Sequence, residues 1–419
     1  MRISRGSINH TLSEDLTTFL ASVLKPSSCA TRAASEQRLL LESDLKSYFS
    51  ISNAVAFPYA RTGVYAALKA LNLAAGSEVL LTPVTIGPMY EVIISLGLKP
   101  VFVDIELKTF GPDLNDLAEK LKNSPPVFLL TYLFGYVPDM NAIMAACNAA
   151  GTRVIEDFSH NIGTTFNGRP VGTFGIAGVY SASLLKFVDG YNGAFVLTND
   201  AQMAESLHLQ EAELTDPDPR RIQGLIRRTF IWNTALNRFV FAAGTFPLLA
   251  TLRKLSPRTF ESLLGPSIRL NLTRNELPAY YFEDISDLQC RTISANLARL
   301  PRLLAQRRAC AQTALESLCE VQGTAHCHPS TESDSQSQQH GYWQLLLAVR
   351  DLQKARDTLF RIGVETGGTN LMDLAYATGN SLKNARALKE RHIFVPLHQH
   401  LTREHYLRIF RELQKAELI

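Results

Sequence analysis

The sequence lacks a run of apolar residues long enough for one helix to cross a membrane. Its most apolar stretch without a charge, residues 239–252, includes Gly244 and Pro247, whereas a spanning helix needs about 20 apolar residues. We expect this stretch to form a buried or interfacial pair of helices. Burial within the protein is favoured over a dimer contact or a membrane surface.

The chain also has little net charge for its length. A formal charge of +3 over 419 residues does not favour nucleic acid as a partner. One local basic cluster, Arg220, Arg221, Arg227 and Arg228, keeps peripheral membrane contact through residues 220–254 open as a hypothesis.

Cysteine is scarce, with six residues and no CxxC pair. No secretory signal peptide is recognisable, so we expect reduced thiols and a cytoplasmic location. His326, Cys327 and His328 offer three metal ligands in one polar loop, but no second cluster accompanies them. We therefore predict no metal site.

The segment from Ala54 to about residue 200 alternates short apolar runs with helical patterns. This order is typical of an α/β fold with a mainly parallel sheet covered by helices. The expected strands are 79–81, 100–103, 127–130, 153–155, 178–181 and 194–197, and the expected helices are 64–71, 89–96, 114–121 and 140–149.

The remaining segments suggest a division of the chain into four parts. Residues 1–53 read as an N-terminal helical leader, and 54–200 as the large domain. Residues 201–285 break the alternation and read as a helical insertion or linker. Residues 286–419, with a long helix and a strand at 342–349, read as a small α+β domain.

An apolar strand followed by polar residues marks the first candidate site segment, TRVIEDFSHNIG. It brings Asp157 to the carboxyl end of a predicted strand, with His160 three positions later. Open parallel sheets bind ligands at that edge. A carboxylate buried there needs a cation, and a protonated pyridine nitrogen would supply one. Taken alone, Asp157 could equally be a helix cap, and His160 a structural histidine.

Two further segments end at the same predicted edge. Lys186 stands in a largely apolar run, where desolvation would leave a nucleophilic amine suited to a Schiff base, and Ser181 offers a hydroxyl for a phosphate oxygen. At Thr62 and Gly63 a turn of small residues opens a helix, whose free amides could hold a phosphate. Each signal is weak by itself, since most lysines lie on the surface.

In their order along the chain these segments resemble the DegT/DnrJ/StrS family of pyridoxal-phosphate-dependent nucleotide-sugar aminotransferases. The resemblance rests on GSEVLLTPVT, LGLKPVFVDIELKTFGPD, FGYVPDMNAIMAAC, VIEDFSHNIGTTFNGRPVGTFGIAGVYSAS and LTND. It implies the fold type I of pyridoxal-phosphate enzymes, a homodimer, and pyridoxal 5'-phosphate as cofactor.

The same resemblance assigns roles to individual residues. Lys186 matches the Schiff-base lysine, Asp157 the carboxylate at the ring nitrogen, and His160 the Gln or His above the ring. Ser181 matches the phosphate-binding serine; Thr62 and Gly63 match the phosphate-binding turn. Related sugar dehydratases carry a histidine in place of Lys186, so the lysine points to transamination.

Three features depart from the family pattern. Ile86 stands where most members place an aromatic residue against the cofactor ring. Phe282, Glu283 and Asp284 replace an Asn-Tyr-Arg segment that reaches the neighbouring subunit's site. The segment 202–281 is longer and more apolar than in the family.

The resemblance therefore implies transfer of an amino group from glutamate or glutamine to a keto sugar carried on a nucleotide, for surface polysaccharide, lipopolysaccharide or an antibiotic sugar. Two alternatives stay open. The changed segment at 282–284 would suit a pyridoxal-phosphate enzyme with a non-sugar keto substrate. A non-catalytic regulatory or membrane-associated binding protein of the same fold would use the insertion as a contact surface, although Lys186 and Asp157 argue against it.

Overall fold

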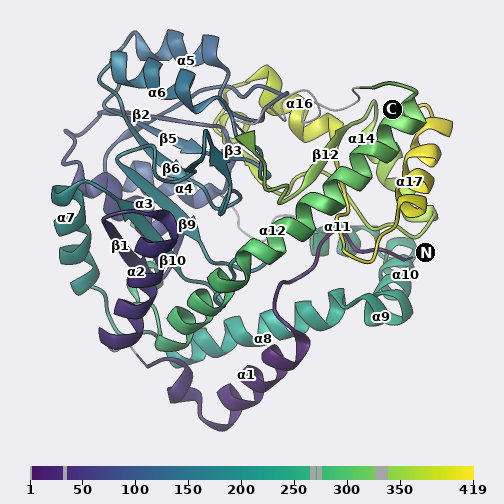
Figure 1. Ribbon diagram of the computed structural model, residues 1–419, viewed down its shortest axis with the longest axis horizontal. Helices are drawn as coiled ribbons and strands as arrows, with labels where there is room; N and C mark the ends of the chain where they lie inside the picture. Colours follow the sequence, from purple (N-terminus) through teal and green to yellow (C-terminus); the bar gives the residue numbers. More distant parts are fainter. Residues whose placement is uncertain (1, 32–34, 265–269, 271–275, 326–337) are drawn as a thin grey trace.

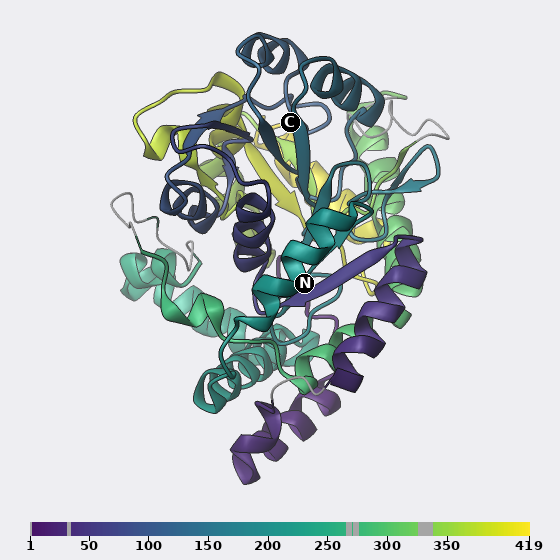
Figure 2. The same ribbon diagram turned by 90° about the vertical axis from the view of Figure 1, so that its left-hand side faces the viewer.

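The computed structural model describes residues 2–31, 35–264, 270, 276–325 and 338–419. Its centre is a seven-stranded sheet with the order β1-β10-β9-β6-β5-β2-β4, seen with its covering helices in Figures 1 and 2. Every strand pair is parallel except the two that β10 makes, with β1 and with β9. The strands are β1 (Asn53–Phe57), β2 (Glu78–Leu81), β4 (Lys99–Phe102), β5 (Val127–Thr131), β6 (Arg153–Asp157), β9 (Ala177–Ser181) and β10 (Ala194–Thr198).

Both faces of this sheet are apolar because both are covered by helices. Alternate strand residues point to opposite faces; Val154 packs into one core cluster and its neighbour Ile155 into the other. The first cluster is closed by α2 (Ser35–Phe49), α5 (Leu114–Leu121), α6 (Met140–Ala149) and α12 (Asp287–Gln322), the second by α3 (Ala60–Ala70), α4 (Gly87–Ser95) and α7 (Ala201–Ala212).

A third apolar cluster lies in the C-terminal part of the chain, where the end of α12 meets a two-stranded antiparallel pair. The segment 2–5 joins it, since Ile3 forms a parallel bridge with Val364. Its elements are β12 (Leu345–Ala348), α14 (Leu352–Arg361), α16 (Lys383–Arg391), β14 (His392–Val395) and α17 (Arg403–Lys415).

Short strand pairs and turns complete this framework. The two-residue strands β3 (Val84–Thr85) and β13 (Met372–Asp373) pair with each other, and β11 (Gln338–Gln339) pairs with the hairpin of β7 (Thr165–Phe166) and β8 (Arg169–Pro170). Helix α15 (Leu374–Ala377) follows β13, and the 3-10 turn η3 (Ala279–Phe282) precedes α12.

The predicted α/β class with a mainly parallel sheet is confirmed, and each predicted strand and helix of residues 54–200 occurs within a few residues of its expected bounds. Strand β1, which the pattern at residues 53–57 did not reveal, is an addition. Cys147, Cys290 and Cys310 are free thiols, but Cys319 is disulfide-bonded, so the expectation of reduced thiols throughout is wrong there. The triplet 326–328 lies outside the described residues.

Residues 201–264 are mostly helical; in Figure 1, α7 stands at the left and α8 to α10 run along the lower part of the molecule. Helix α1 (Leu12–Leu24) packs beside α8, and Phe19 stacks on Phe230. The helices of residues 201–264 are α7, α8 (Pro219–Leu236), α9 (Arg238–Val240), α10 (Phe246–Leu255) and α11 (Pro257–Leu264), and a π-helical turn, η2 (Phe241–Thr245), precedes α10. A 3-10 turn, η1 (Pro26–Cys29), follows α1.

The apolar stretch 239–252 is only partly buried. Phe241 and Phe246 are enclosed, but Phe239 is 67% exposed and Leu248 59%, so the expectation of burial within the protein is wrong for these two. Within the described ranges, no helix by itself combines the length and the hydropathy needed to cross a bilayer. Helices α8 and α9–α10 meet that test only as a pair bent by 60°.

Candidate functional site

The predicted site residues from strands β6 and β9 meet at the carboxyl edge of the sheet. Asp157 is the last residue of β6 and lies opposite Val179 of β9 in the parallel register. Ser159 links the two strands: its Oγ donates to Asp157 Oδ1 over 2.5 Å and accepts from the amide of Ser181 over 3.1 Å. The sheet therefore brings Asp157 and Ser181 together, as the sequence predicted.

Asp157 is buried, with 4% of its surface exposed. Its Oδ1 also accepts the amide of Ser159 over 3.1 Å, while within the described chain no donor is bonded to Oδ2. Burial raises the pKa of Asp157, and the bond from Ser159 and the charge of Lys186 oppose that effect. A cationic N–H at Oδ2 would stabilise the ionised carboxylate.

Lys186 lies in the loop between β9 and β10. Leu185 before it adopts a left-handed backbone with φ of 73°, and the Lys186 amide donates to the carbonyl of Ser183 over 3.1 Å. Burial lowers the pKa of the Lys186 amine to about 8, although the charge of Asp157 acts in the other direction. An amine with this pKa is partly neutral near pH 7.5, so it can act as a nucleophile or accept a proton.

His160 is buried beside the same amine. Its Nδ1 accepts the amide of Phe134 over 3.2 Å, so the ring proton resides on Nε2. Burial, with the charge of Lys186 second, holds the pKa of His160 well below its usual value. The ring is thus a neutral donor with one fixed tautomer.

Trp343 completes this group from the C-terminal part of the chain. Its indole stacks on His160 with 3.8 Å between ring centroids, and the Lys186 Nζ lies 4.7 Å from an indole centroid. The indole N–H donates to the Leu185 carbonyl over 2.9 Å. The approach requires Gly135, at φ of +90°, because a Cβ there would lie 2.4 Å from the Trp343 amide nitrogen.

The turn at Thr62 and Gly63 differs from expectation. Both amides donate to the carbonyl of Tyr59 over 3.0 Å, so the free amides expected near Thr62 and Gly63 are not those of these two residues. They already belong to the helical hydrogen-bond ladder, which leaves only the earlier amides of a first turn open. In the described chain those amides, of Ala60 and Arg61, have no acceptor.

Gly63 has a packing role instead. A Cβ there would lie 2.8 Å from Val196 Cγ2 and 3.1 Å from Val179 Cγ1. The Thr62 hydroxyl donates to the Tyr281 carbonyl over 2.6 Å. The Arg61 guanidinium stands within 4.1 Å of the Tyr59 ring centroid, close to the open end of α3.

The unusual residues Ile86, Glu283 and Asp284 are placed as follows. Ile86 precedes α4 and packs partly buried against the α3–α4 side of the sheet. Glu283 pairs with Arg221 over 2.8 Å, and Asp284 with Arg38 over 2.5 Å. Both acids are thus used within this subunit to fix the chain before α12.

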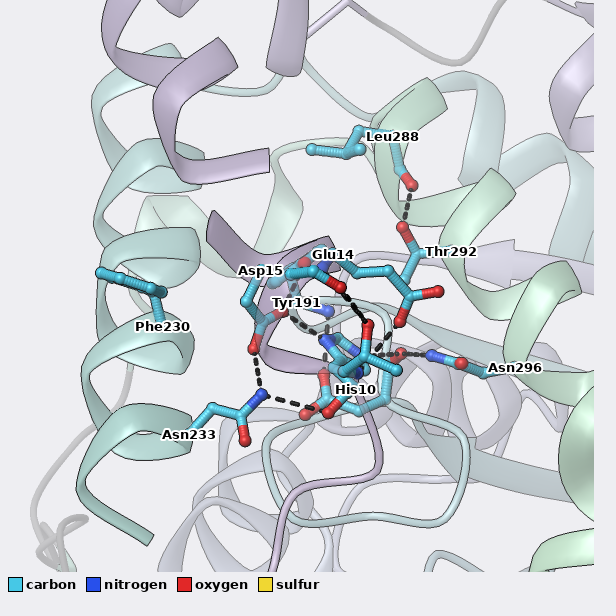
Figure 3. Close-up of polar contacts among 12 residues, drawn as sticks. His10, Glu14, Asp15, Tyr191, Phe230, Asn233, Leu288, Thr292 and Asn296 are labelled. Atoms are coloured by element: carbon cyan, nitrogen blue, oxygen red, sulfur yellow. Dashed lines mark hydrogen bonds and ion pairs between the residues drawn. The ribbon is translucent and has the colours of Figure 1, made fainter. Parts of the chain in front are cut away.

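A buried polar network fixes the far end of the Lys186 loop (Figure 3). His10 Nδ1 lies 2.8 Å from Asp15 Oδ1, and the hydroxyl of Tyr191 donates to the same oxygen over 2.6 Å. His10 Nε2 contacts the Asp189 carbonyl over 2.9 Å, and Asn296 donates to that carbonyl over 2.7 Å. The N-terminal segment thereby holds the loop that carries the lysine.

Asn9 makes the most direct of these contacts. Its side-chain amide donates to the carbonyls of Lys186 over 3.2 Å and of Phe187 over 3.3 Å. Neither Asn9 nor Trp343 was predicted from the sequence, because neither stands in a motif and each reaches the site from more than 150 residues away along the chain. Of the few possible signals, only the rarity of tryptophan, with two in the chain, would have drawn notice to Trp343.

Comparison with protein families gives one match: residues 16–221 and 274–414 fit the model described as the DegT/DnrJ/EryC1/StrS aminotransferase family. Among curated proteins, the chain is 32% identical over 166 residues to a pleiotropic regulatory protein of Geobacillus stearothermophilus, covering 39% of this chain and 45% of that one. It is 29% identical over 168 residues to a UDP-N-acetyl-3-dehydro-alpha-D-glucosamine 3-aminotransferase of Acidithiobacillus ferrooxidans, covering 40% and 46%. These alignments span less than half the length of the curated relatives.

Solved structures agree over nearly the whole chain. An aminotransferase from Psychrobacter cryohalolentis superposes with a TM-score of 0.73 at 18% identity, covering 98% of each chain. An aminotransferase of Helicobacter pylori involved in the biosynthesis of pseudoaminic acid gives 0.70 at 14% identity, covering 99% of each. These likenesses show the fold.

Proposed function

Since the chain belongs to the DegT/DnrJ/EryC1/StrS aminotransferase family, we propose that it transfers an amino group from glutamate or glutamine to a keto sugar carried on a nucleotide, with pyridoxal 5'-phosphate as cofactor. The observation that carries the proposal is the partly buried Lys186 amine, with a pKa of about 8, beside the buried carboxylate of Asp157. Relatives named as nucleotide-sugar enzymes support the substrate class.

The residues at the sheet edge suit this cofactor. When bound, pyridoxal phosphate supplies an aldehyde for an amine and a ring that accepts electrons from a carbanion. Asp157 Oδ2 is open to a ring N–H, and Lys186 Nζ can receive the aldehyde. Ser181 and the open first turn of α3, with Arg61 beside it, would hold the phosphate end.

The chain's own groups then account for the proton transfers. Lys186 Nζ, with its pKa near neutrality, can accept a proton from a carbon acid and return it to the neighbouring position. His160 stays neutral and offers its Nε2 proton as a fixed donor. Trp343 covers His160 and approaches the Lys186 amine, which limits water at that side of the site.

An absorption experiment tests this proposal. Purified protein with added pyridoxal phosphate should show a band near the visible edge, which glutamate or glutamine should shift to shorter wavelength. Lys186→Ala should lack the band, while Lys389→Ala keeps it; Lys389 is a second partly buried lysine with a lowered pKa. A band that survives in Lys186→Ala would refute the role of this lysine.

Keto-sugar acceptors can then be separated from the alternatives. Turnover of a nucleotide-linked keto sugar by the donor-treated protein supports the proposal. A donor half-reaction followed by turnover of keto acids only would favour the non-sugar alternative, and a protein without a lysine-dependent band would favour the binding-protein alternative.

The proposal includes a cytoplasmic homodimer, the arrangement that the family resemblance implies. Sedimentation of the cofactor-loaded protein tests it: a mass of one chain at micromolar concentration would contradict the dimer. The domain division at residues 53, 200 and 285 stays a prediction, which limited proteolysis can examine.

We also propose peripheral contact with an anionic membrane through residues 220–254. Residues 219–260 contain eight Arg or Lys and no acid, and Trp232 and Phe239 are 40% and 67% exposed. Apolar side chains beside cations are typical of surfaces that bind anionic lipid. In flotation with phosphatidylglycerol vesicles, the fraction of protein that floats should fall for the double variant Trp232→Ala/Phe239→Ala. It should stay at the parent's level for Leu209→Ala, whose leucine is 65% exposed on α7. Equal flotation of the parent and both variants would contradict the contact.

A further inference from the structure

A cavity of about 330 Å³ lies between the N-terminal segment, the end of α8, the middle of α12 and the turn at 397–400. It is separate from the reacting end of Lys186, which does not line it. Its wall includes Asn9 and Phe187, the two residues that flank the backbone of Lys186 on this side. We call it the basic cavity because of the charges described next.

All the charged side chains that line the basic cavity are cationic. Arg2, Arg238 and Arg307 contribute guanidinium groups, and none of the described lining residues is an acid. Arg307 donates to the carbonyl of Leu397 over 2.6 Å, and Arg2 donates to the carbonyl of Ala242. In the described chain no carboxylate lies within ion-pair distance of any of the three.

The histidines of the cavity do not supply a compensating charge. Burial lowers the pKa of His398 to about 4, and burial together with Arg238 lowers that of His400. Both rings are neutral at pH 7, and they stack with 5.3 Å between centroids. His10 is the one lining imidazole with a raised pKa, and its charge is paired with Asp15 outside the cavity.

Arg307 gives the strongest indication that the cavity suits an anion. Burial lowers its pKa, yet an arginine stays protonated in proteins. In the described chain this partly buried cation has a peptide carbonyl as its one bonded acceptor, so it lacks the counter-charge that normally offsets desolvation. An oxyanion in the cavity would provide that counter-charge, and guanidinium forks match the oxygens of phosphate groups.

We propose that the basic cavity is a binding site for a diphosphate-bearing small molecule, distinct from the site at Lys186. Three guanidinium groups suit the charge of a diphosphate better than that of a single carboxylate. The volume is at the lower end of the range for small-molecule sites, roughly 300–1,000 Å³, and the apolar side chains of Ile8 and Phe241 leave room for an attached organic group.

Occupancy also has a consequence for the Lys186 loop. The occupant would lie against Asn9, whose amide holds the carbonyls of Lys186 and Phe187. A ligand that tethers the segment 2–10 to α12 would therefore stabilise the position of the loop. This inference does not depend on the reaction proposed for Lys186.

Titration calorimetry of the protein loaded with pyridoxal phosphate tests the site, since the loaded form leaves no free cofactor phosphate site. Inorganic pyrophosphate and uridine diphosphate are the probes. We expect both to bind, and Arg307→Gln and Arg238→Gln each to weaken binding by about tenfold or more, as loss of one charge-assisted contact should. Arg302→Gln, on an exposed position of the same helix, should stay within about twofold of the parent.

Each outcome decides the matter. If pyrophosphate binds as tightly as uridine diphosphate, the diphosphate is the recognised group; tighter binding of uridine diphosphate would show that the organic part contributes as well. Absence of binding, or binding that neither Arg307→Gln nor Arg238→Gln weakens, would overturn the proposal. Arg238 is exposed, so its variant remains informative even if Arg307→Gln fails to fold.

Discussion

The titration of Lys186 is the sharpest test of the candidate site. With a pKa of about 8, roughly a quarter of the amine is neutral at pH 7.5, against about 0.1% for a lysine with the ordinary value. Its reactivity toward an aldehyde at that pH should therefore exceed that of a surface lysine by about two hundredfold. The side chain is partly exposed, so a small reagent can reach it.

The pKa can be measured without any cofactor. Reductive methylation with carbon-13 formaldehyde labels lysines, and the shift of each dimethylamine carbon against pH gives its midpoint. Lys186→Met assigns the signal. We expect a midpoint near 8, and in Asp157→Asn a lower one, because the Asp157 carboxylate stabilises the charged amine.

Lys389 provides the internal control. Burial lowers its pKa too, but the opposing charge there is Asp373, so its midpoint should not respond to Asp157→Asn. A midpoint for Lys186 above 10 would refute the burial of its amine. An upward shift in Asp157→Asn would refute the pairing of the two groups.

Three further predictions concern stability. Glu156 accepts the Tyr132 hydroxyl over 2.6 Å and the amides of Gly172 and Gly175 over 2.9 and 2.7 Å. Glu156→Ala should therefore lower the free energy of unfolding in urea by about 4 kcal/mol. A loss below about 1 kcal/mol would contradict the network. Gly63→Ala should lower the free energy of unfolding by about 1–3 kcal/mol, because the added Cβ would contact Val196. Gly224→Ala, in open space inside α8, should raise it by about 0.5–1 kcal/mol. A change in the same direction for both variants would be inconsistent with the packing. Burial lowers the pKa of His10, but the bond to Asp15 and nearby acids outweigh burial and raise it to about 9. Protonated His10 therefore adds on the order of 3 kcal/mol to the free energy of unfolding; this contribution is complete below about pH 6.5 and is lost as pH rises through 9. Urea unfolding from pH 6 to 10 should show that decline, and Asp15→Asn should make the decline smaller.

The sheet and the residues at its edge were predictable because their signals are local. Apolar runs such as 127–130 and 153–155 encode buried strands, and the strand ending at Asp157 carries its functional group within the same run of sequence. Once parallel strands are inferred, their carboxyl ends must lie together. The positions of Asp157 and Ser181 follow from that rule.

The remaining parts of the site depend on contacts between distant segments. Trp343 meets His160, and Asn9 meets Lys186, only after the chain has folded. The sequence placed free amides near Thr62 and Gly63 but could not say which residues carry them, because a one-residue difference in where a helix begins decides which amides are free. The exposure of Phe239 could not be foreseen from apolarity alone, since a hydrophobic face does not reveal what covers it.

The N-terminal segment has a consequence for the order in which the molecule is assembled. Ile3 donates its amide to the carbonyl of Gly363 and accepts the amide of Glu365, each over 2.8 Å, so its partners are about 360 positions away along the chain. Contacts between segments so far apart along the chain are slow to form, because a long loop must close before they can be made. Because Asn9 and His10 follow directly behind Ile3 and contact the Lys186 loop, we expect the loop to be fixed in place only after this long-range contact has formed.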